Sequence, residues 1–325
     1  MTARKSFSSR AVPERILREG ATRKPFSSRA ASAAMPAAGA VGEWLERGEK
    51  YLEKSGVPES RANAEFLMAA LLGVGRANLE FRRLRPLETR RAHIFWDWVL
   101  RRSRRVPLAY VLGMQPFLQL DLRVGPGVLI PRPETEELAE LSIRLGKQLL
   151  DGGRRSLRVL DVGTGSGCLA LSLAKALPQA EVAAIEPSRK AMAYAKSNAR
   201  HCGLVSRVAF LTSARALKPE WQADLIVSNP PYVPTGRLRK LEPEVLKEPR
   251  LALDGGEDGL RVIRTVIRLA RHRMRPGGWF ALEMDSKHGR KVLELLGRSG
   301  FERAETRRDA QRLVRFAIAR KPKSA

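Results

Sequence analysis

The chain has 325 residues, 43% of them hydrophobic and 29% charged, values typical of a soluble globular protein large enough for two domains. No apolar run approaches the ~20 residues of a bilayer-spanning helix, and the two cysteines, Cys168 and Cys202, argue against a disulfide framework or a cysteine-based metal site. The net charge of +26 favours an anionic neighbour such as ribosomal RNA or DNA, although an arginine-rich coding composition has the same effect.

Residues 1–40 are predicted to be a disordered basic tail. They contain eight basic and two acidic residues, a net charge of +6, and show no hydrophobic periodicity. The pattern Phe-Ser-Ser-Arg occurs at residues 7–10 and again at 26–29. A transit segment has a similar composition, and a translation start at Met35 would also explain the tail.

Residues 41–106 are predicted to be a small helical domain that recognises the substrate. Apolar residues recur every three to four positions in 41–55, 59–72 and 88–105, and Gly56, Pro58 and Gly73 separate the first two helices and end the second. The aromatic residues of these helices are expected to form a core.

Residues 107–134 are predicted to be a β-hairpin linker, because short apolar runs replace the helical pattern. Pro131 and Pro133 favour an extended path, and the next helix is expected to begin at Glu134 or Thr135. This linker would place Arg132 beside the domain that follows.

Residues 135–325 are predicted to form an α/β domain. Apolar runs that indicate strands alternate with amphipathic segments that indicate helices, which is the pattern of a parallel sheet covered on both faces. Strands are expected at 157–160, 182–185, 208–211, 225–227, 278–284 and 313–319, and helices at 168–177, 188–201, 261–275 and 292–298.

A glycine-rich turn follows the first of these strands, from Asp161 to Gly167. Glycines let the backbone approach a ligand closely, and Glu186 ends the next strand, where ribose hydroxyls are usually bound. The phosphate-binding pattern Gly-x-x-x-x-Gly-Lys is absent, which disfavours a kinase-type site. A structural strand-to-helix turn is the alternative reading of the glycines.

The sequence Asn229-Pro230-Pro231-Tyr232 ends the strand at 225–227. Neither proline can donate a ladder hydrogen bond, so Asn229 is left at the carboxyl end of a strand, where open α/β sheets bind ligands. Its amide both donates and accepts, which suits an amide or exocyclic amine, although an Asn-Pro pair can also simply make a turn. Together with Asp161 and the glycine turn, this motif indicates S-adenosylmethionine.

Several segments resemble one family, the glutamine methyltransferases that modify peptide chain release factors. The matching segments are 107–113 (PLAYVLG), 129–136 (LIPRPETE), 160–167 (LDVGTGSG), 228–232 (SNPPY) and 248–260 (EPRLALDGGEDGL), within residues 41–319. The resemblance implies a class I S-adenosylmethionine-dependent methyltransferase fold, Rossmann-like, with a mostly parallel seven-stranded sheet after a small helical domain.

The family's activity would be methyl transfer to the side-chain amide nitrogen of the glutamine in a release factor's Gly-Gly-Gln motif. The implied catalytic residues are Asn229, Pro230 and Tyr232. The implied substrate-binding residues are Asn229, Pro230, Pro231, Tyr232 and Arg132. The implied cofactor-binding residues are Asp161, Gly163, Thr164, Gly165, Ser166, Gly167, Glu186, Arg215 and Asn229.

The sequence departs from the family pattern near the expected adenine site. Ala214 and Arg215 stand where the family carries an acidic residue and a large aromatic residue, and Glu283-Met284-Asp285 replaces the usual Glu-His or Glu-Gly. Arg132 could bind the substrate or pair with Glu134 or Glu136. The basic segment 237–240 could cover the substrate or be a solvated charge run.

Three other functions fit some of these features. An enzyme acting on adenine or cytosine amino groups shares the Asn-Pro-Pro-Tyr motif, a ribosomal-protein glutamine methyltransferase shares the chemistry, and a non-catalytic RNA- or ribosome-binding protein would explain the charge. The expected partners are release factors, with the ribosome or its RNA nearby, in the cytoplasm and without a membrane or a metal.

Overall fold

The computed structural model describes residues 39–323, which form two compact units. The helical unit comprises the residues up to Met114 together with Pro243–Lys247, and the sheet unit comprises Gln115–Glu242 and the residues from Glu248 onward. Of the expected tail, the structure describes only Gly39 and Ala40. The repeated Phe-Ser-Ser-Arg pattern and Met35 lie outside the described residues.

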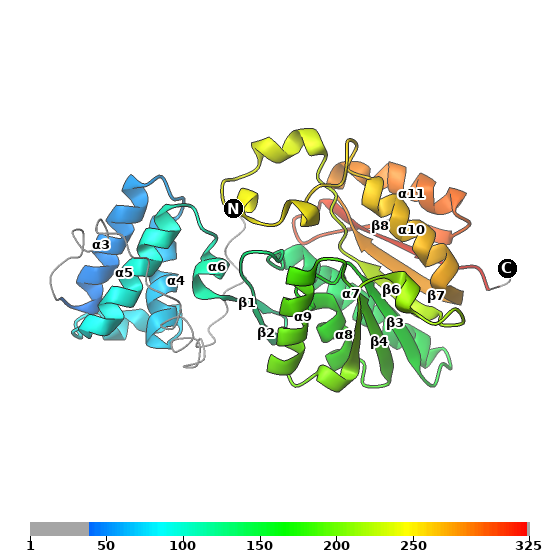
Figure 1. The fold of residues 1–325 in the computed structure, drawn as a ribbon, viewed down its shortest axis with the longest axis horizontal. Coiled ribbons are helices and arrows are strands. Elements are labelled where there is room, and N and C mark those ends of the chain that lie inside the picture. Colours follow the sequence, from blue (N-terminus) through cyan, green and yellow to red (C-terminus); the bar gives the residue numbers. More distant parts are fainter. Residues whose placement is uncertain (1–38, 324–325) are drawn as a thin grey trace. The chain divides into compact units, whose positions relative to one another are not determined.

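The helical unit packs its helices around an apolar core, as the periodicity predicts. Gly73 ends the second long helix with a φ of 64°, a left-handed conformation that glycine adopts readily. Trp44 and Phe95 are fully buried and meet edge to face, with ring centroids 6.5 Å apart. The helices of this unit (Figure 1) are α3 (Val41–Lys54), α4 (Ser60–Leu72), η1 (Arg76–Arg82), α5 (Thr89–Ser103), α6 (Leu108–Leu112) and η5 (Val245–Lys247).

The segment expected to be a hairpin linker begins with a helix, α6, and only then forms the hairpin. The Pro107 carbonyl accepts the N–H groups of Tyr110 and Val111, which starts the helix, and Val111 is buried in the core of the helical unit. The two short strands that follow are β1 (Met114–Phe117) and β2 (Leu120–Arg123). The expected extended path through Pro133 is also wrong, since Pro133 is the first residue of the next helix, a position that suits proline.

The sheet unit contains a mostly parallel seven-stranded sheet, as the resemblance implied. Its strand order is β5-β4-β3-β6-β7-β9-β8. The five strands from β5 to β7 in this order are parallel, and β9 is antiparallel to both β7 and β8. The strands are β3 (Leu157–Val162), β4 (Ala180–Ile185), β5 (Val208–Leu211), β6 (Ala223–Ser228), β7 (Met274–Glu283), β8 (Glu302–Arg308) and β9 (Val314–Arg320).

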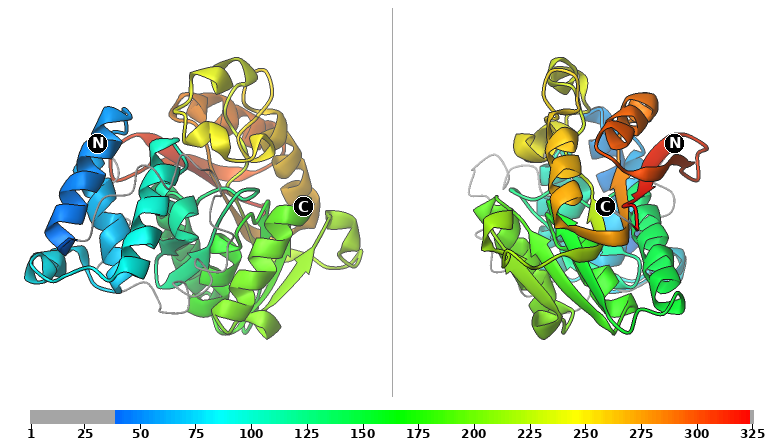
Figure 2. Two further views of the ribbon diagram at one scale, coloured as in Figure 1. Left: turned by 60° about the vertical axis from the view of Figure 1, so that its left-hand side comes forward. Right: turned by 90° about the vertical axis from the view of Figure 1, so that its right-hand side faces the viewer.

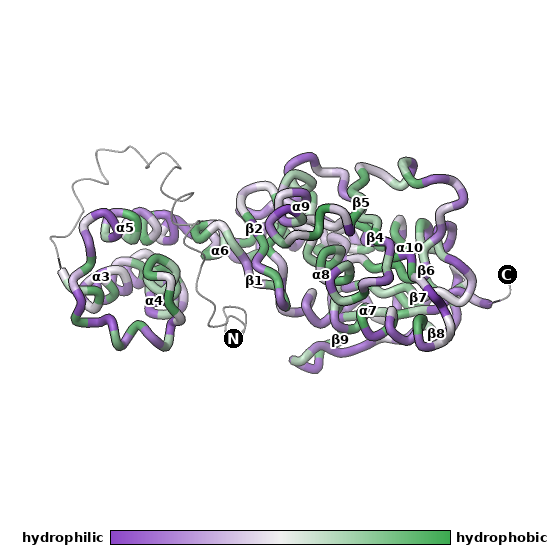
Figure 3. Tube along the Cα trace, turned by 90° about the horizontal axis from the view of Figure 1, so that it is seen from below, coloured by the Kyte–Doolittle hydropathy of each residue, from purple (hydrophilic) through white to green (hydrophobic). Residues whose placement is uncertain are grey.

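Strand β8 has no counterpart among the strands expected from apolar runs. Its sequence, ERAETRR, is hydrophilic at almost every position, and its tube is mostly purple in Figure 3. It pairs on one side only, at the edge of the sheet, where neither face has to be fully buried. Backbone pairing with β9 therefore makes the strand without an apolar pattern.

Helices cover both faces of the sheet (Figure 2). Along β6, Leu225 and Val227 pack into one apolar cluster with Leu138 and Leu169, whereas Ile226 packs into the other. The longer helices are α7 (Pro133–Asp151), α8 (Cys168–Ala176), α9 (Arg189–His201), α10 (Arg261–Arg273) and α11 (Gly289–Arg298). The short 3₁₀ helices are η2 (Val205–Arg207), η3 (Ala214–Ala216), η4 (Thr235–Lys240), η6 (Arg250–Ala252) and η7 (Ser286–His288).

Candidate functional site

The two sequence motifs lie next to each other at the carboxyl ends of neighbouring strands. β3 and β6 pair in parallel, with Asp161 opposite Val227. Ser228 is fully buried and its hydroxyl donates to the carbonyl of Val162 at 2.7 Å, which ties the ends of both strands together. The glycine turn after β3 and Asn229 after β6 therefore share one edge of the sheet, which we call the carboxyl edge.

The glycine turn requires glycine for its backbone conformation. Gly163, Gly165 and Gly167 have φ values of 79°, 58° and 87°. A Cβ on Gly163 would meet nothing within 4 Å, so the side at which a ligand would approach this residue is open. The N–H groups of Gly163 and Thr164 donate to the carbonyl of Ile185 at 2.8 and 3.0 Å, which fixes the turn to the end of β4.

Asp161 holds the glycine turn onto the following helix. It is fully buried, and one carboxylate oxygen accepts from the Thr164 hydroxyl at 2.6 Å and from the Ala170 N–H at 3.1 Å. Burial raises the pKa of Asp161 to about 7. Its other oxygen, Oδ1, is buried without a hydrogen-bond partner among the described residues. Ser166 is also buried, and its carbonyl accepts from Asn198 at 2.8 Å.

Glu186 binds the same turn from the end of β4. Its two carboxylate oxygens accept from the N–H of Gly165 at 2.9 Å and from the N–H of Ser188 at 2.8 Å. Burial raises its pKa. A carboxylate has about four lone-pair sites, so each oxygen can accept a second hydrogen bond from a ligand hydroxyl. Glu186 thus lies beside the glycine turn, and its contact with ribose hydroxyls stays a prediction.

A chain of hydrogen bonds connects Asn229 to Tyr232 through two residues that were not predicted as site residues. The Asn229 amide donates to the Thr135 hydroxyl at 2.9 Å, and that hydroxyl donates to Glu283 Oε2 at 2.8 Å. The Tyr232 hydroxyl donates to Glu283 Oε1 at 3.0 Å. We call Asn229, Thr135, Glu283 and Tyr232 the site network.

Glu283 is the buried centre of the site network. Burial raises its pKa to about 7, against hydrogen bonds from Thr135 and Tyr232 that favour the carboxylate. Burial and the neighbouring Glu283 carboxylate raise the pKa of Tyr232 well above its usual range. Tyr232 is thus a neutral hydroxyl donor at neutral pH, and Glu283 is close to its midpoint.

Sequence reasoning missed the roles of Thr135 and Glu283 because their partners are far away in the chain. The bond between Asn229 and Thr135 spans 94 positions, and the bond between Thr135 and Glu283 spans 148. One signal was present: Glu283 is an acidic residue that ends an apolar strand, as Glu186 does. A carboxylate at the carboxyl end of a central strand could have been proposed as a site residue on that ground.

Arg132 pairs with a residue that was not foreseen. Its guanidinium forms an ion pair with Glu248, whose other oxygen accepts from the Ile130 N–H at 2.9 Å. The expected pairing with Glu134 or Glu136 is therefore wrong, and Glu136 instead accepts from the Leu118 N–H at 3.0 Å. Glu248 is buried, whereas Glu134 and Glu136 are only partly buried, so the ion pair with Glu248 is the better shielded from water.

The chain at Tyr232 and Val233 also contacts the loop at 254–259, which is part of the family-like segment 248–260. Val233 pairs with Asp254 in an isolated bridge, and the Gly255 N–H donates to the Val233 carbonyl at 2.8 Å. At Gly259 an added Cβ would lie 2.5 Å from the Tyr232 carbonyl, so only glycine fits there without a shift. The loop thereby supports the backbone that leads out of Tyr232.

The basic segment lies in η4, directly after the Asn-Pro-Pro-Tyr motif, and the residues of the expected adenine region lie in η3, which follows β5. In η4, Arg237 pairs with Asp285 at 2.8 Å, while Arg239 and Lys240 are exposed. Arg215 is exposed in η3, which follows β5, and it makes no hydrogen bond or ion pair with another described residue. Its neighbour Ala214 packs partly against the apolar cluster of Ile226.

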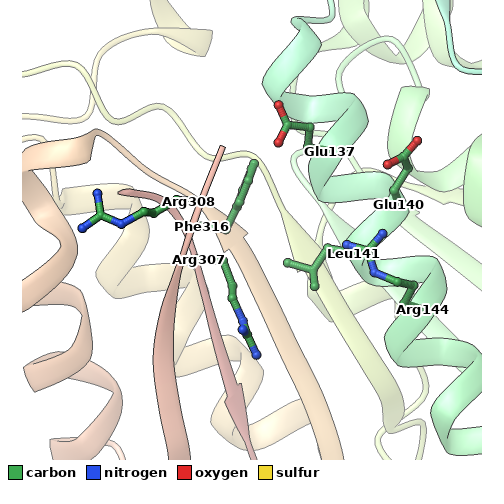
Figure 4. Close-up of a pocket in the computed structure, with 7 residues that line it drawn as sticks. All are labelled: Glu137, Glu140, Leu141, Arg144, Arg307, Arg308 and Phe316. Atoms are coloured by element: carbon green, nitrogen blue, oxygen red, sulfur yellow. The ribbon is translucent and has the colours of Figure 1, made fainter. Parts of the chain in front are cut away.

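A separate cavity of about 370 Å³ lies between α7 and strands β8 and β9 (Figure 4). Its lining mixes carboxylates, guanidinium groups and two apolar side chains, and it contains none of the predicted site residues. The lining residues are Glu137, Glu140, Leu141, Arg144, Arg307, Arg308 and Phe316. Glu137 accepts from the Ala310 N–H at 3.0 Å. This lining does not resemble a nucleotide or methyl-donor site.

Two negative findings apply to residues 39–323. Within that range there is no cluster of histidine, cysteine, aspartate and glutamate that could hold a metal ion. None of the helices described there has the length and apolar character needed to cross a membrane.

Comparison with protein-family models matches both units of the chain. Residues 43–113 match the PrmC N-terminal domain, and residues 145–256 match the methyltransferase small domain. Both motifs of the carboxyl edge lie within the second match.

Curated relatives match over most of the chain. The chain is 41% identical over 254 residues to the release factor glutamine methyltransferase of Geobacter sulfurreducens, covering 77% of this chain and 86% of the relative. It is also 41% identical over 271 residues to the same enzyme of Moorella thermoacetica, covering 82% and 91%. A solved structure of the hMettl16 catalytic domain with the MAT2A 3'UTR hairpin 6 is 18% identical, with a TM-score of 0.50 over 72% of this chain and 82% of that one, a likeness of fold alone.

Proposed function

The chain belongs to the family of release factor glutamine methyltransferases, and we propose that it transfers a methyl group from S-adenosylmethionine to the glutamine amide nitrogen in the Gly-Gly-Gln motif of release factors. The observation that carries the proposal is the position of Asn229, beside the glycine turn and at the carboxyl end of the neighbouring strand. A methyl donor held by the turn and an amide held by Asn229 would therefore meet.

The residues of the carboxyl edge fit S-adenosylmethionine. The open side of Gly163 leaves room for the methionine part, and Glu186 has lone pairs left for two ribose hydroxyls. The bound cofactor supplies a methyl group on a positively charged sulfur, which is an electrophile with a neutral leaving group. Asp161, Thr164 and Ser166 then act through the shape of the turn, which their hydrogen bonds maintain.

Asn229 and Pro230 would orient the substrate amide. An amide nitrogen is a weak nucleophile because its lone pair is delocalised. The rate of transfer therefore depends strongly on how well the enzyme orients the amide toward the methyl group. The side-chain oxygen of Asn229 and the carbonyl of Pro230 can each accept one hydrogen of the substrate NH₂ group, which points the nitrogen lone pair at the methyl group. Tyr232 and Pro231 would form the wall against which the planar amide lies.

The proton balance needs no strong base. As the carbon–nitrogen bond forms and the carbon–sulfur bond breaks, the amide nitrogen becomes positively charged and strongly acidic. One of its protons then leaves through the hydrogen bond to Asn229 or Pro230 and reaches water, and the product is a neutral N-methyl amide. Arg132 would act at a distance, by holding Glu248 and the linker near the site.

We also propose that the enzyme works in the cytoplasm, close to the ribosome, since its substrates act in translation termination. The net charge of +26 would favour proximity to ribosomal RNA through long-range attraction. This attraction weakens with salt, whereas recognition of the glutamine does not depend on it.

The test is a transfer assay with labelled S-adenosylmethionine and four separate acceptors: a release factor, the same factor with its Gly-Gly-Gln glutamine replaced by alanine, ribosomal proteins, and DNA. Label on the intact factor alone is the expected result. Label that persists on the replaced factor would contradict the proposed target residue.

Two outcomes would support other functions. Label on a ribosomal protein or on DNA would show that the site accepts a different amide or amine. A second outcome is the absence of label on every acceptor together with no cofactor binding in calorimetry. It would mean that Ala214 and Arg215, which depart from the family pattern, prevent cofactor binding and that the protein is a non-catalytic RNA- or ribosome-binding relative.

A further inference from the structure

We propose that Thr135 and Glu283 are positioning residues, which decide which atom of the Asn229 side chain faces the substrate. This inference rests on the proposed function and adds to it a device that sets the direction of one amide. It concerns two residues that the activity leaves without a role, one at the start of α7 and the other at the end of β7.

Thr135 is placed to act through its hydroxyl alone. It is 1% exposed, and its Oγ1 lies 2.9 Å from the Asn229 Nδ2 and 2.8 Å from Glu283 Oε2. A hydroxyl has one hydrogen to donate and two lone pairs that accept. Once that hydrogen points at one neighbour, the hydroxyl can only accept from the other.

The carboxylate of Glu283 decides where the Thr135 hydrogen points. In its ionised form, which prevails above pH 7, Glu283 can only accept hydrogen bonds, and it accepts from Thr135 and, at 3.0 Å, from Tyr232. The Thr135 oxygen must therefore accept from Asn229, so the NH₂ group of Asn229 faces Thr135. The Asn229 oxygen is then left to face the substrate.

The reverse orientation of Asn229 would be unproductive. It would place two oxygen lone pairs against each other at Thr135 and would present an NH₂ group to the NH₂ group of the substrate. Both contacts lose a hydrogen bond, and leaving buried polar groups unpaired is costly. The polarity of the site network thus selects the rotamer of Asn229 that can hold a glutamine amide.

No cation is in contact with Glu283 to perform this task in place of the hydroxyls. Among the described residues its hydrogen bonds come from Thr135 and Tyr232 only, and no ion pair includes it. The nearby charges that act on it are Glu134 and Arg315, and Arg315 itself pairs with Asp309 at 3.1 Å. The direction of the network therefore depends on the two hydroxyl donors and the carboxylate.

The test compares Thr135→Val, which keeps the shape and removes the hydroxyl, with Thr135→Ser, which keeps the hydroxyl. Thr265→Val on α10 is the matched control, because Thr265 is exposed and outside the site network. For each variant we would measure kcat on the release factor, KM for S-adenosylmethionine and the thermal midpoint. We expect Thr135→Val to lose about tenfold to hundredfold in kcat, with KM changed less than about threefold. Thr135→Ser should retain most of the rate.

The outcomes separate this inference from the proposed function. If the wild-type enzyme transfers no methyl group to the release factor, the proposed function is overturned and this inference with it. An active wild type with an equally fast Thr135→Val, or a Thr135→Ser that loses as much as Thr135→Val, would overturn the inference alone.

If Thr135→Val does not fold, Glu283→Gln provides the same test. Glutamine keeps the volume of Glu283 but carries a donor, so it no longer forces the direction of the Thr135 hydrogen. We expect kcat to fall about tenfold or more while the thermal midpoint at pH 8 does not fall. A lower midpoint with an unchanged kcat would show that Glu283 is only structural.

Discussion

The two ends of strand β6 lead to two buried carboxylates that are bonded in opposite ways. At the first end, Asp224 is fully buried, pairs with the guanidinium groups of Arg154 and Arg275, and accepts from the Arg158 N–H at 2.8 Å. At the other end, Asn229 leads to the Glu283 carboxylate, which is equally buried but receives only neutral hydroxyl donors.

The difference separates structural charges from functional ones. A buried charge with a partner is satisfied in place, as is Arg102 in the helical unit, which bonds to Asn63 at 2.7 Å and pairs with Glu244 at 2.8 Å. A buried carboxylate without a cation is costly to ionise, and burial raises the pKa of Glu283 to about 7. We infer that this cost persists at the carboxyl edge because the edge orients a reacting amide.

The largest expected effect is on the rate when Asn229 is truncated. Asn229→Ala removes the acceptor that would orient the substrate, so kcat should fall about a thousandfold, as when a transition-state hydrogen-bond partner is removed. The stability should change little, because Asn229 is only partly buried. Stopped assays of methyl transfer check the rate, and the exposed Asn78→Ala is the control. A decrease in kcat of less than tenfold would show that Asn229 does not hold the substrate amide.

The second expected effect is a dependence of stability on pH. Burial raises the pKa of Glu283 from an ordinary value of 4.5 to about 7, so the folded state holds this proton more tightly than the unfolded state. Its contribution to stability is therefore complete below pH 4.5 and is lost as the pH rises toward 7. Glu283→Gln should remove that loss and increase the free energy of unfolding at pH 8 by about 3 kcal/mol.

Urea unfolding at pH 5 and pH 8 would measure this effect in the wild type and in Glu283→Gln. The variant should gain stability relative to the wild type at pH 8 only. A variant that is less stable than the wild type at pH 8 would show that the carboxylate stabilises the fold, and the comparison between the two ends of β6 would fail.

A third and smaller effect is expected at the first end of β6. Asp224→Asn keeps the shape but removes the charge that Arg154 and Arg275 share, and both arginines are partly exposed and can be rehydrated. We expect a loss of about 2 kcal/mol in the free energy of unfolding, below the range for a fully buried pair. Urea unfolding measures it, and kcat of the folded variant should match the wild type.

The smallest expected effect is on cofactor affinity. Glu186→Gln places a donor against the N–H of Gly165 or of Ser188 and weakens a ribose contact, so the Kd for S-adenosylmethionine should increase about tenfold. Glu181→Gln, an exposed change on β4, the strand that precedes Glu186, is the control for calorimetry. An unchanged Kd would remove Glu186 from the cofactor site.

The sequence was sufficient where local pattern determines structure. The apolar run before Asn229 and the two prolines after it predict a strand that ends there, and the alternation of strands and helices predicts the parallel part of the sheet. The positive φ values at Gly163, Gly165 and Gly167 follow from the glycine pattern itself. These features need no knowledge of distant residues.

The sequence was insufficient where tertiary pairing determines structure. Strand β8 has no apolar pattern because it lies at an edge, and α6 is fixed by the core of the helical unit rather than by its own propensity. The partner of Arg132 and the bond from Thr135 to Glu283 join segments more than 100 residues apart. Such contacts have no signature in a single sequence.

The difference in role between the two ends of β6 can be tested in one experiment, which measures kcat and the urea midpoint in the same preparations of Asn229→Ala and Asp224→Asn. We expect a crossed result: Asn229→Ala has a much lower kcat and an unchanged urea midpoint, whereas Asp224→Asn has an unchanged kcat and a lower urea midpoint. If both variants lose midpoint and rate together, the two ends of β6 do not differ in role, and Asn229 is a structural residue.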